Sequence, residues 1–526
     1  MKQVDIAVLL VYLLGVVALG SWFVRSSRTT ERFMAAGRSL PGWAVGLSIF
    51  GTYLSSNTFI GVPGKAYAAN WNVFVFSLAI PIVAVIAVRF FVPFYRRSGE
   101  ISAYHHLEKR FGLWARTLAV TCYLLTQVAR TGSILLGMAY GLNALLEWPV
   151  AVIIVVTGAS VTLYTLLGGI EAVIWTDVAQ SIILIIGAVL VALMLVLGMP
   201  EGPGQIFAVA AANPGGNKFS LGSFGASLTE TTFWVVFVYG VVMNLNNFGI
   251  DQSFVQRYHT ARSDREAARS VWLGALLYLP ISAVFLFIGT SLFAYYQSQP
   301  DMLAEIRANV AADDLAQEGV SRDSPGYRAK LAEAAADLEP NEIGDKVLPH
   351  FIVSRLPPGM AGLVIAAIFA AAMSSIDTSL NSSATIVLAD VYKRYFRPVA
   401  GERESMLVLY LATLLFGALG TGLAVALIGV SSVLDAWWLL SGIFVAGMLG
   451  VFLLGLMSRR ATNAGAAIGA VCGVLVTAWV VFLIMVPESW GWPESPLHEF
   501  LIPVVGTATI IVVGLLASRF LASGRS

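Results

Sequence analysis

The sequence predicts an all-α protein that crosses a membrane many times, and three observations support this fold class. Only 12% of the 526 residues are charged and 57% are hydrophobic, whereas soluble domains carry about 25% charged residues. Mean hydropathy is +0.78 over the whole chain, so the apolar surplus is not confined to one anchor. About thirteen apolar stretches reach or approach the roughly 20 residues that a helix needs to cross a bilayer. These stretches are residues 4–25, 41–66, 71–96, 112–146, 149–167, 176–199, 228–252, 268–294, 360–391, 404–427, 430–457, 463–487 and 498–521.

The stretches are predicted to be helices rather than strands of a barrel. Barrel strands are about half as long and alternate in polarity, which these stretches do not. The first stretch resembles a signal peptide, but it carries Asp5 and ends in arginines rather than at a small-residue cleavage site, so we predict a retained span. A net charge of +1 gives no reason to expect a nucleic-acid partner. No cysteine lies at metal-ligand spacing from His105 and His106, so we expect neither a zinc-type site nor an enzyme.

Basic residues cluster after every second stretch, with one exception. Clusters of Lys and Arg follow the first, third, seventh, ninth and eleventh stretches, and they include Arg96, Lys109, Arg257 and Lys393. The loop after the fifth stretch has no Lys or Arg. Because cytoplasmic loops are enriched in Lys and Arg, the alternation predicts a multi-pass protein of the cell (inner) membrane. Its N-terminus is expected outside and its C-terminus in the cytoplasm, which agrees with an odd number of spans.

Two longer segments, 200–227 and 296–350, fall on the predicted outer side. The first is rich in Gly and Pro, and the second contains a charged, alanine-rich stretch with helical periodicity. A solvated surface helix is the simplest interpretation of the second segment. A gating lid is the alternative, since long loops in compact folds are often functional.

Two of the apolar stretches, 41–66 and 228–252, contain runs of residues that disfavour a continuous helix. The first run includes Gly51, Ser55 and Thr58, and the second includes Asn244 and Asn247. Interrupted helices at corresponding positions of two halves predict an inverted-repeat transporter with its substrate near the midplane; the alternative is that the polar runs only join helices. The single domain, 1–526, then divides into an extra helix at 4–25, a first repeat at 41–199, a second repeat at 228–457 and C-terminal helices at 463–521.

Few charged residues lie within the stretches. Lys65 is near an outer end, and four arginines lie towards cytoplasmic ends, where long side chains reach the interface; the four are Arg89, Arg96, Arg116 and Arg269. Arg130 lies near the middle of a long stretch, where that explanation is poor. We expect Arg130 either to pair with an internal acid or to bind an anion with its planar guanidinium.

The stretch 360–391 carries the strongest chemical signal. Ala371, Ser374, Ser375 and Thr378 have the spacing of one helix face. A hard cation such as sodium needs oxygen ligands, and hydroxyls together with carbonyls freed by a broken helix supply them. Asp377 and Thr378, with an acid from another helix, could complete a second oxygen cage. Close packing of small residues explains the alanines but not Asp377.

Two long motifs resemble the sodium:solute symporter family, which contains sodium–glucose and sialic-acid cotransporters. GGIEAVIWTDVAQ (168–180) resembles a signature of the family, and LPPGMAGLVIAAIFAAAMSSIDTSLNSSATIVLADVYKRY resembles its sodium-site helix. Shorter matches are FIG (59–61) and DQSFVQR (251–257). The resemblance implies an inverted-repeat fold of the APC/LeuT type with about thirteen helices, and alternating access driven by Na+, the coupling ion. Its expected partners are sodium ions, a small solute and the lipid bilayer.

The resemblance also implies two sets of sodium ligands. For site one these are backbone carbonyls of Gly51, Leu54 and Ala371 with the hydroxyls of Ser374 and Ser375. For site two they are Asp177, Ser374, Asp377 and Thr378, where Asp377 stands in place of a serine of the sialic-acid type. The number of sodium ions per cycle and the oligomeric state stay open.

The solute is expected to be a sugar acid such as sialic acid. Arg130 resembles the arginine that grips the carboxylate in sialic-acid carriers, and Ser55 and Thr58 fall at their substrate-contacting hydroxyls. Asn244 matches an asparagine of the galactose carriers, but Thr58 and Tyr278 stand where those carriers have glutamine and lysine. The substrate-binding set is therefore Ser55, Thr58, Arg130, Asn244, Asn247 and Tyr278. A neutral-sugar or monocarboxylate symporter is the alternative, and a channel or a transporter-like sensor is the alternative from another class.

Overall fold

The computed structural model describes residues 2–23, 27–146, 148–429, 433–486, 490–493 and 495–523. Helices account for most of these residues, and no strand is present in the described part of the chain apart from one isolated bridge between Leu40 and Ala261. The α-helices are α1 (Gln3–Trp22), α2 (Thr30–Ala35), α3 (Gly42–Tyr53), α4 (Ser56–Ala68), α5 (Phe74–Ile86), α6 (Val92–Ser98), α7 (His105–Phe111), α8 (Leu113–Leu146), α9 (Val150–Leu197), α10 (Gly204–Ala211), α11 (Phe233–Gly249), α12 (Gln252–Thr260), α13 (Asp264–Gln297), α14 (Pro300–Gln317), α15 (Tyr327–Asp337), α16 (Pro340–Arg355), α17 (Met360–Ile386), α18 (Glu402–Ala426), α19 (Val433–Met457), α20 (Asn463–Met485) and α21 (Ile502–Ser523).

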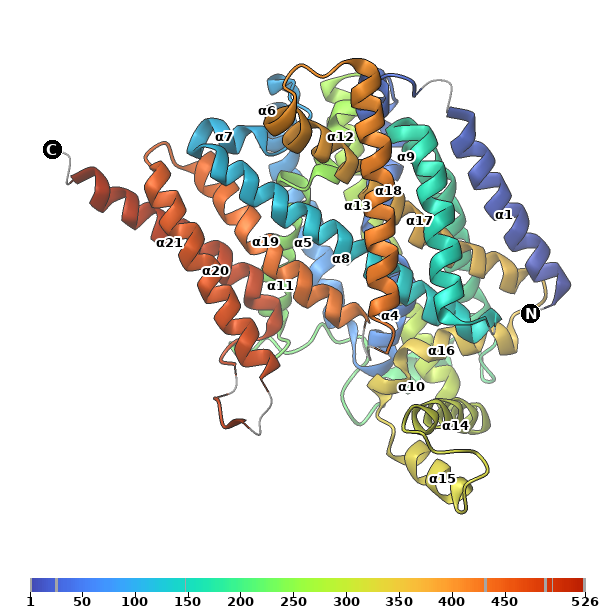
Figure 1. Ribbon diagram of the computed structural model, residues 1–526. Coiled ribbons are helices and arrows are strands. Elements are labelled where there is room, and N and C mark those ends of the chain that lie inside the picture. Colours follow the sequence, from blue (N-terminus) through green and yellow to red (C-terminus); the bar gives the residue numbers. More distant parts are fainter. Residues whose placement is uncertain are drawn as a thin grey trace.

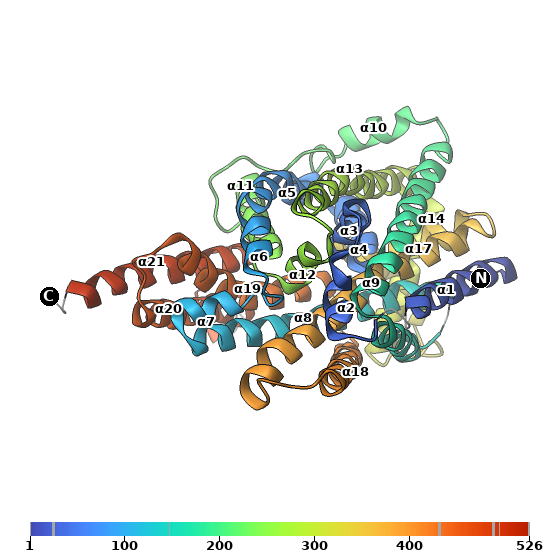
Figure 2. The same ribbon diagram turned by 90° about the horizontal axis from the view of Figure 1, so that it is seen from above.

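The all-α membrane fold is confirmed. Nine helices of the described residues are long and apolar enough to cross a membrane, and the bent pair α11 and α12 makes a possible tenth. The prediction of about thirteen spans stays a prediction, as do the division into repeats and the parts of three spans, 24–25, 430–432 and 487, that lie outside the described residues. The termini lie at opposite edges of the bundle, with α1 at one edge and α20 and α21 at the other (Figures 1 and 2).

The predicted break in 41–66 separates α3 from α4. Leu54 adopts an extended conformation (φ −99°, ψ 113°), and α4 begins after Ser55, whose hydroxyl accepts a hydrogen bond from the amide of Thr58. The Thr58 hydroxyl in turn accepts from the amide of Ser55, 3.3 Å away. This reciprocal capping satisfies amides that a helix start leaves unpaired. The polar run of this stretch therefore builds a new helix start inside the span.

The second break lies between α11 and α12, which are bent by 47° relative to each other. Asp251 caps α12 by accepting a hydrogen bond from the amide of Ser253 at 2.8 Å. The predicted stretch ended at residue 252, whereas the broken helix continues to Thr260. The expected boundary was wrong because α12 is too polar to register as an apolar span. Its sequence, QSFVQRYHT, is nevertheless buried throughout.

The predicted spans 149–167 and 176–199 are joined without the loop that the sequence suggested. Helix α9 runs through both, and only Gly169 departs from helical geometry, with φ at 58°. At about 1.5 Å per residue, 48 residues would extend about 72 Å if straight, more than twice the roughly 30 Å of the hydrocarbon core. The kink at Gly169 therefore separates two membrane-crossing halves. A Cβ at this position would lie 2.9 Å from Cα of Phe33, so glycine also allows the close approach of that residue.

Helix α17 lies at the centre of the bundle. In the most apolar 18 residues of Met360–Phe396, 89% of the residues are buried. The corresponding share is 28% in α1, which lies at the edge of the bundle. Asp5 of α1 holds the start of α17, because its Oδ1 accepts hydrogen bonds from the amides of Gly359 (2.7 Å) and Gly362 (3.0 Å). A carboxylate at a helix N-terminus satisfies unpaired amides and complements the helix dipole.

Of the two longer segments, 200–227 is mostly irregular and 296–350 is largely helical. The first contains α10 and the buried Lys218, whose Nζ donates to the carbonyl oxygens of Tyr67 (2.6 Å) and Ala68 (3.1 Å) at the end of α4. Burial lowers the pKa of Lys218 to about 8. The second contains α14 and α15, which project from one end of the bundle, while α6 and α7 lie at the opposite end (Figure 1). The charged, alanine-rich stretch forms α14, as its periodicity predicts, but Ile306, Val310 and Ala311 are buried, so one face of this helix packs against the protein rather than lying in solvent.

Helix α16 continues the second segment and packs against α4. The two helices meet at Gly64 and Gly344: a Cβ on Gly64 would lie 2.9 Å from the carbonyl oxygen of Gly344. This contact couples the segment 296–350 to the helix that follows the first break.

Arg116 does not reach the interface as predicted. It is 5% exposed, and its guanidinium forms ion pairs with Asp390 (2.6 Å) and Glu108 (2.6 Å). The prediction was wrong because two acids distant in sequence pack around the arginine. Hydrogen bonds from Arg394, together with Arg116, lower the pKa of Glu108 to about 2. This cluster ties α7 and α8 to the end of the α17 span.

Candidate functional site

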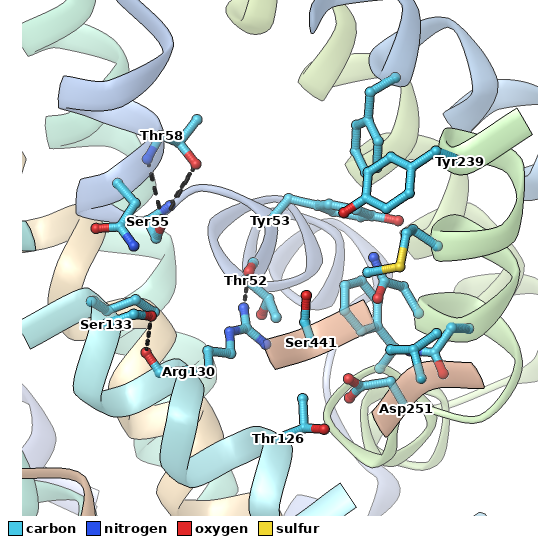
Figure 3. Close-up of a pocket in the computed structure, with 18 of the residues that line it drawn as sticks. Thr52, Tyr53, Ser55, Thr58, Thr126, Arg130, Ser133, Tyr239, Asp251 and Ser441 are labelled. Carbon is cyan, nitrogen blue, oxygen red and sulfur yellow. Dashed lines mark hydrogen bonds between the residues drawn. The ribbon is translucent and has the colours of Figure 1, made fainter. Parts of the chain in front are cut away.

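A pocket of about 170 Å³ lies between the two helix breaks (Figure 3). Its walls come from the α3–α4 break, from α5, α8, α11, α13 and α19, and from the loop between α11 and α12. The polar side chains that line it are Thr52, Tyr53, Ser55, Asn57, Thr58, Thr126, Gln127, Arg130, Ser133, Tyr239, Asn246, Asn247, Asp251, Tyr278 and Ser441. A site between two broken helices is the arrangement that an inverted-repeat transporter provides.

Five of the six predicted substrate residues line this pocket: Ser55, Thr58, Arg130, Asn247 and Tyr278. Asn244 does not. Its side chain is fully buried behind Tyr53, whose hydroxyl donates to Asn244 Oδ1 at 2.9 Å. A role for Asn244 would therefore act through Tyr53, which itself lines the pocket.

Arg130 carries the positive charge of the pocket. One guanidinium nitrogen donates to the carbonyl oxygen of Thr52, the penultimate residue of α3. No ion pair within 4.0 Å joins Arg130 to an acid of the described chain, so the predicted alternative of internal pairing is not realised. In Figure 3 the guanidinium points into the cavity from α8. Its remaining donors are placed to hold a carboxylate.

The predicted ligands of sodium site one come together at the first break. Ser374 Oγ lies 3.3 Å from the carbonyl oxygens of Gly51 and Ala371. Ser375 Oγ lies 3.3 Å from the carbonyl oxygen of Leu54. Both serines are at most 1% exposed. Five oxygen atoms, with no nitrogen or sulfur among them, form a donor set that suits a hard cation.

The predicted ligands of site two surround a residue that the sequence did not suggest. Arg257 of α12 donates through one terminal nitrogen to Asp177 Oδ2 (2.9 Å) and to Thr378 Oγ1 (2.6 Å). Its Nε donates to Ser48 Oγ at 2.7 Å. Arg257 was expected in a basic cytoplasmic loop, but the residue is fully buried. The only sequence signal for its position was its membership of the motif 251–257.

Asp377 lies beside this cluster without a cation of its own. Its Oδ2 accepts from the hydroxyl of Tyr164 at 2.8 Å, and its Oδ1 accepts from the amide of Thr378 at 2.6 Å. Asp177 Oδ1 is buried and has no hydrogen-bond partner among the described residues. Two carboxylates and one guanidinium give the cluster a formal excess of one negative charge, which suits it to a further monovalent cation.

The break after α3 serves both kinds of site. The carbonyls of Gly51 and Leu54 face the serines of α17, while the side chains of Ser55 and Thr58 face the pocket. A cation held by those carbonyls would fix the backbone of 51–54, and with it the pocket wall that begins at residue 52. The backbone of 51–54 is thus shared by the oxygen cage and the pocket wall.

Comparisons with known proteins identify the family of the chain and the fold that it shares. A family model described as the sodium:solute symporter family matches residues 33–321 and 326–473. The sodium/sialic acid symporter NanT of Aliivibrio fischeri is 30% identical over 97% of this chain and 92% of its own length. The sodium/sialic acid symporter SiaT of Proteus mirabilis is 31% identical over 99% of this chain and 96% of its own length. A solved structure of a sodium-coupled sialic acid symporter in a substrate-bound, outward-open state matches with a TM-score of 0.83 at 29% identity, covering 99% of this chain and 98% of that one.

Proposed function

The chain belongs to the sodium:solute symporter family, and we propose that the solute it carries with sodium is a carboxylated sugar such as a sialic acid. The protein is a multi-pass, sodium-coupled membrane transporter and not an enzyme. The observation that carries the proposal is Arg130, which forms no ion pair with the described residues and lies in a pocket whose other polar lining consists of hydroxyl and amide groups and the carboxylate of Asp251.

Sodium site one is proposed to consist of the carbonyls of Gly51, Leu54 and Ala371 and the hydroxyls of Ser374 and Ser375. Sodium bound there would fix the break between α3 and α4 and so complete the pocket wall at Ser55 and Thr58. The solute carboxylate would then bind Arg130. Because ion and solute stabilise the same backbone, each would raise the affinity for the other by the same factor.

A second sodium ion is proposed to bind near Asp177, Asp377, Ser374 and Thr378. The support is the excess negative charge of this cluster and the unpartnered Oδ1 of Asp177. The proposed topology keeps the N-terminus outside and the C-terminus in the cytoplasm, in a single domain of two inverted repeats, 41–199 and 228–457.

A neutral-sugar or a monocarboxylate symporter remains the second candidate. The absence of a solute charge would leave the half-buried guanidinium of Arg130 uncompensated, which disfavours a neutral sugar. A monocarboxylate satisfies Arg130 but leaves the polar lining of the pocket without partners.

Uptake into proteoliposomes tests the proposal. An inward sodium gradient should drive accumulation of radiolabelled sialic acid, and Ser375→Ala should raise the sodium concentration for half-maximal uptake about 10–100-fold, since a hydrogen-bonding ligand of a charged group contributes about 1.5–3 kcal/mol. The matched control is Ser379→Ala, because the Ser379 hydroxyl is equally buried but bonds only to the carbonyl of Ser375 within the helix. Unchanged sodium dependence in Ser375→Ala would rule out the assignment of site one.

Arg130→Gln tests the solute assignment separately. The variant should lose binding of sialic acid but keep the stabilisation that sodium alone gives in a thermal-shift assay. The exposed Arg269→Gln is the control and should behave as the unmodified protein. Retained sialic-acid affinity in Arg130→Gln would refute the carboxylate contact.

A further inference from the structure

Asp251 is a second charged group in the same pocket, contributed by the break between α11 and α12. It is 5% exposed. One of its oxygens, Oδ1, accepts hydrogen bonds from the amide of Ser253 at 2.8 Å and from the Ser253 hydroxyl. The described residues donate no hydrogen bond to the other oxygen, Oδ2. Oδ1 therefore caps α12, and Oδ2 is available to a ligand.

Asp251 and Arg130 face the same cavity without neutralising each other. They are not within the 4.0 Å of an ion pair, and the guanidinium of Arg130 donates to the carbonyl oxygen of Thr52 instead. In Figure 3 the Asp251 carboxylate points towards the part of the pocket into which Arg130 also points. The pocket thus presents a hydrogen-bond donor with positive charge and an acceptor with negative charge at two separate places.

We propose that Asp251 determines specificity by accepting hydrogen bonds from hydroxyl or amine groups of the solute at a distance from its carboxylate. The inference rests on the proposed function, which supplies the contact between the carboxylate and Arg130. Asp251 selects solutes that carry an acid at one end and hydrogen-bond donors at the other. It rejects acids with an apolar tail and acids with a second carboxylate.

The free-energy cost of a buried charge makes this selection strong. A carboxylate that loses water and gains no donor is expensive, so a solute with an apolar tail must leave Asp251 unsatisfied. A site built to pair a solute hydroxyl rejects the analogue that lacks it by about 10⁴–10⁵-fold. A second carboxylate would be repelled by the like charge.

The size of the pocket agrees with such a solute. A cavity of about 150 Å³ accommodates benzene, and this pocket measures about 170 Å³. It therefore has room for a six-membered ring between Arg130 and Asp251. A three-carbon acid bound to Arg130 would leave part of that space, including Oδ2 of Asp251, without solute contacts.

The test uses Asp251→Asn in the full-length protein. Asparagine is as good an N-cap as aspartate, so the variant keeps α12 capped through its side-chain oxygen. Its amide nitrogen then faces the pocket, which replaces the acceptor by a donor. Asp251→Ser also keeps a cap but withdraws the pocket-facing group. Equal thermal midpoints of the three proteins without solute establish that the fold is intact.

Dissociation constants are measured at saturating sodium for three probes: sialic acid, which carries hydroxyls, glucosaminate, which carries hydroxyls and an amine, and propionate, which carries neither kind of donor. We expect Asp251→Asn to weaken sialic acid and glucosaminate about 10–100-fold and to change propionate less than threefold. An equal loss for all three probes, or no loss for any, overturns the proposal. Failure of the unmodified protein to bind any of the three acids refutes the proposed function itself.

Discussion

Replacement of Arg257 by methionine tests whether the buried arginine stabilises the fold through Asp177. The side chains of Arg257 and Asp177 are 1% and 0% exposed. Methionine fills similar volume but removes the hydrogen bonds to Ser48, Thr378 and the carbonyl of Ser253, together with the ion pair. Asp177 would keep only the Ser48 hydroxyl, since its Oδ1 has no partner among the described residues.

The expected loss follows from that uncompensated carboxylate. Removing one partner of a buried ion pair costs about 3–5 kcal/mol, whereas an apolar replacement of both partners is often nearly neutral. The free energy of unfolding of Arg257→Met should therefore fall by about 3–5 kcal/mol. The double variant Arg257→Met/Asp177→Asn should lose about 1–3 kcal/mol less than the sum of the two single variants, as expected for residues in contact.

The assay is denaturant unfolding of the detergent-solubilised protein, followed by circular dichroism in sodium-free buffer, since bound sodium would add its own stabilisation. The matched control is Arg269→Met, because Arg269 is 66% exposed and pairs with Glu266 at the surface. Such a pair contributes at most about 1 kcal/mol. A loss below 1 kcal/mol in Arg257→Met, or strict additivity in the double variant, would refute the assignment of Asp177 as the group left unpaired.

Three further predictions concern residues outside the pocket, each measured by the same unfolding assay. Asp5→Ala should lose about 0.5–2 kcal/mol because it removes the acceptor for two amides at the start of α17, and Asp5→Asn should lose less; equal stability of Asp5→Ala and the unmodified protein would contradict this. Burial lowers the pKa of Lys218 from 10.5 to about 8, so the unfolded chain binds more protons between these values and stability should rise with pH across that window. Lys218→Met should reduce that rise, and an unchanged pH profile would count against it. Gly64→Ala should lose about 1–3 kcal/mol through overpacking against Gly344, whereas Gly15→Ala, where a Cβ meets nothing within 4 Å, should lose nothing; similar losses at both positions would contradict the packing argument.

The spans and both helix breaks were predictable because they depend on local composition. Hydropathy located α8, α13 and α18 within a few residues, and the polar runs around Ser55 and Asn247 marked helix interruptions. The grouping of Ser374 and Ser375 with the first break was predictable because two long motifs carried the resemblance. These features share one property: a short window of sequence contains the whole signal.

The remaining features depend on contacts between distant segments. Arg257 looks like a loop arginine because α12 is polar, and only the acid on α9 explains its burial. Helical periodicity puts Asn244 near the same face as Asn247, but Tyr53 from another helix covers Asn244. The sequence predicted a loop between the spans 149–167 and 176–199, but the chain turns there at Gly169 alone, which has a positive φ. Composition does not distinguish a kink at one glycine from a longer turn.

The enclosure of α17 also bears on the order in which the chain is built into the membrane. An aspartate at the centre of a helix costs about 2.5–3.5 kcal/mol on insertion into lipid, and Asp377 occupies that position in α17. The hydroxyl of Tyr164 in α9 donates a hydrogen bond to Asp377. Helix α9 leaves the ribosome before α17, because synthesis proceeds from the N-terminus. The central helix therefore enters a bundle whose polar partners are already present, and its biogenesis depends on helices that it contacts rather than on lipid.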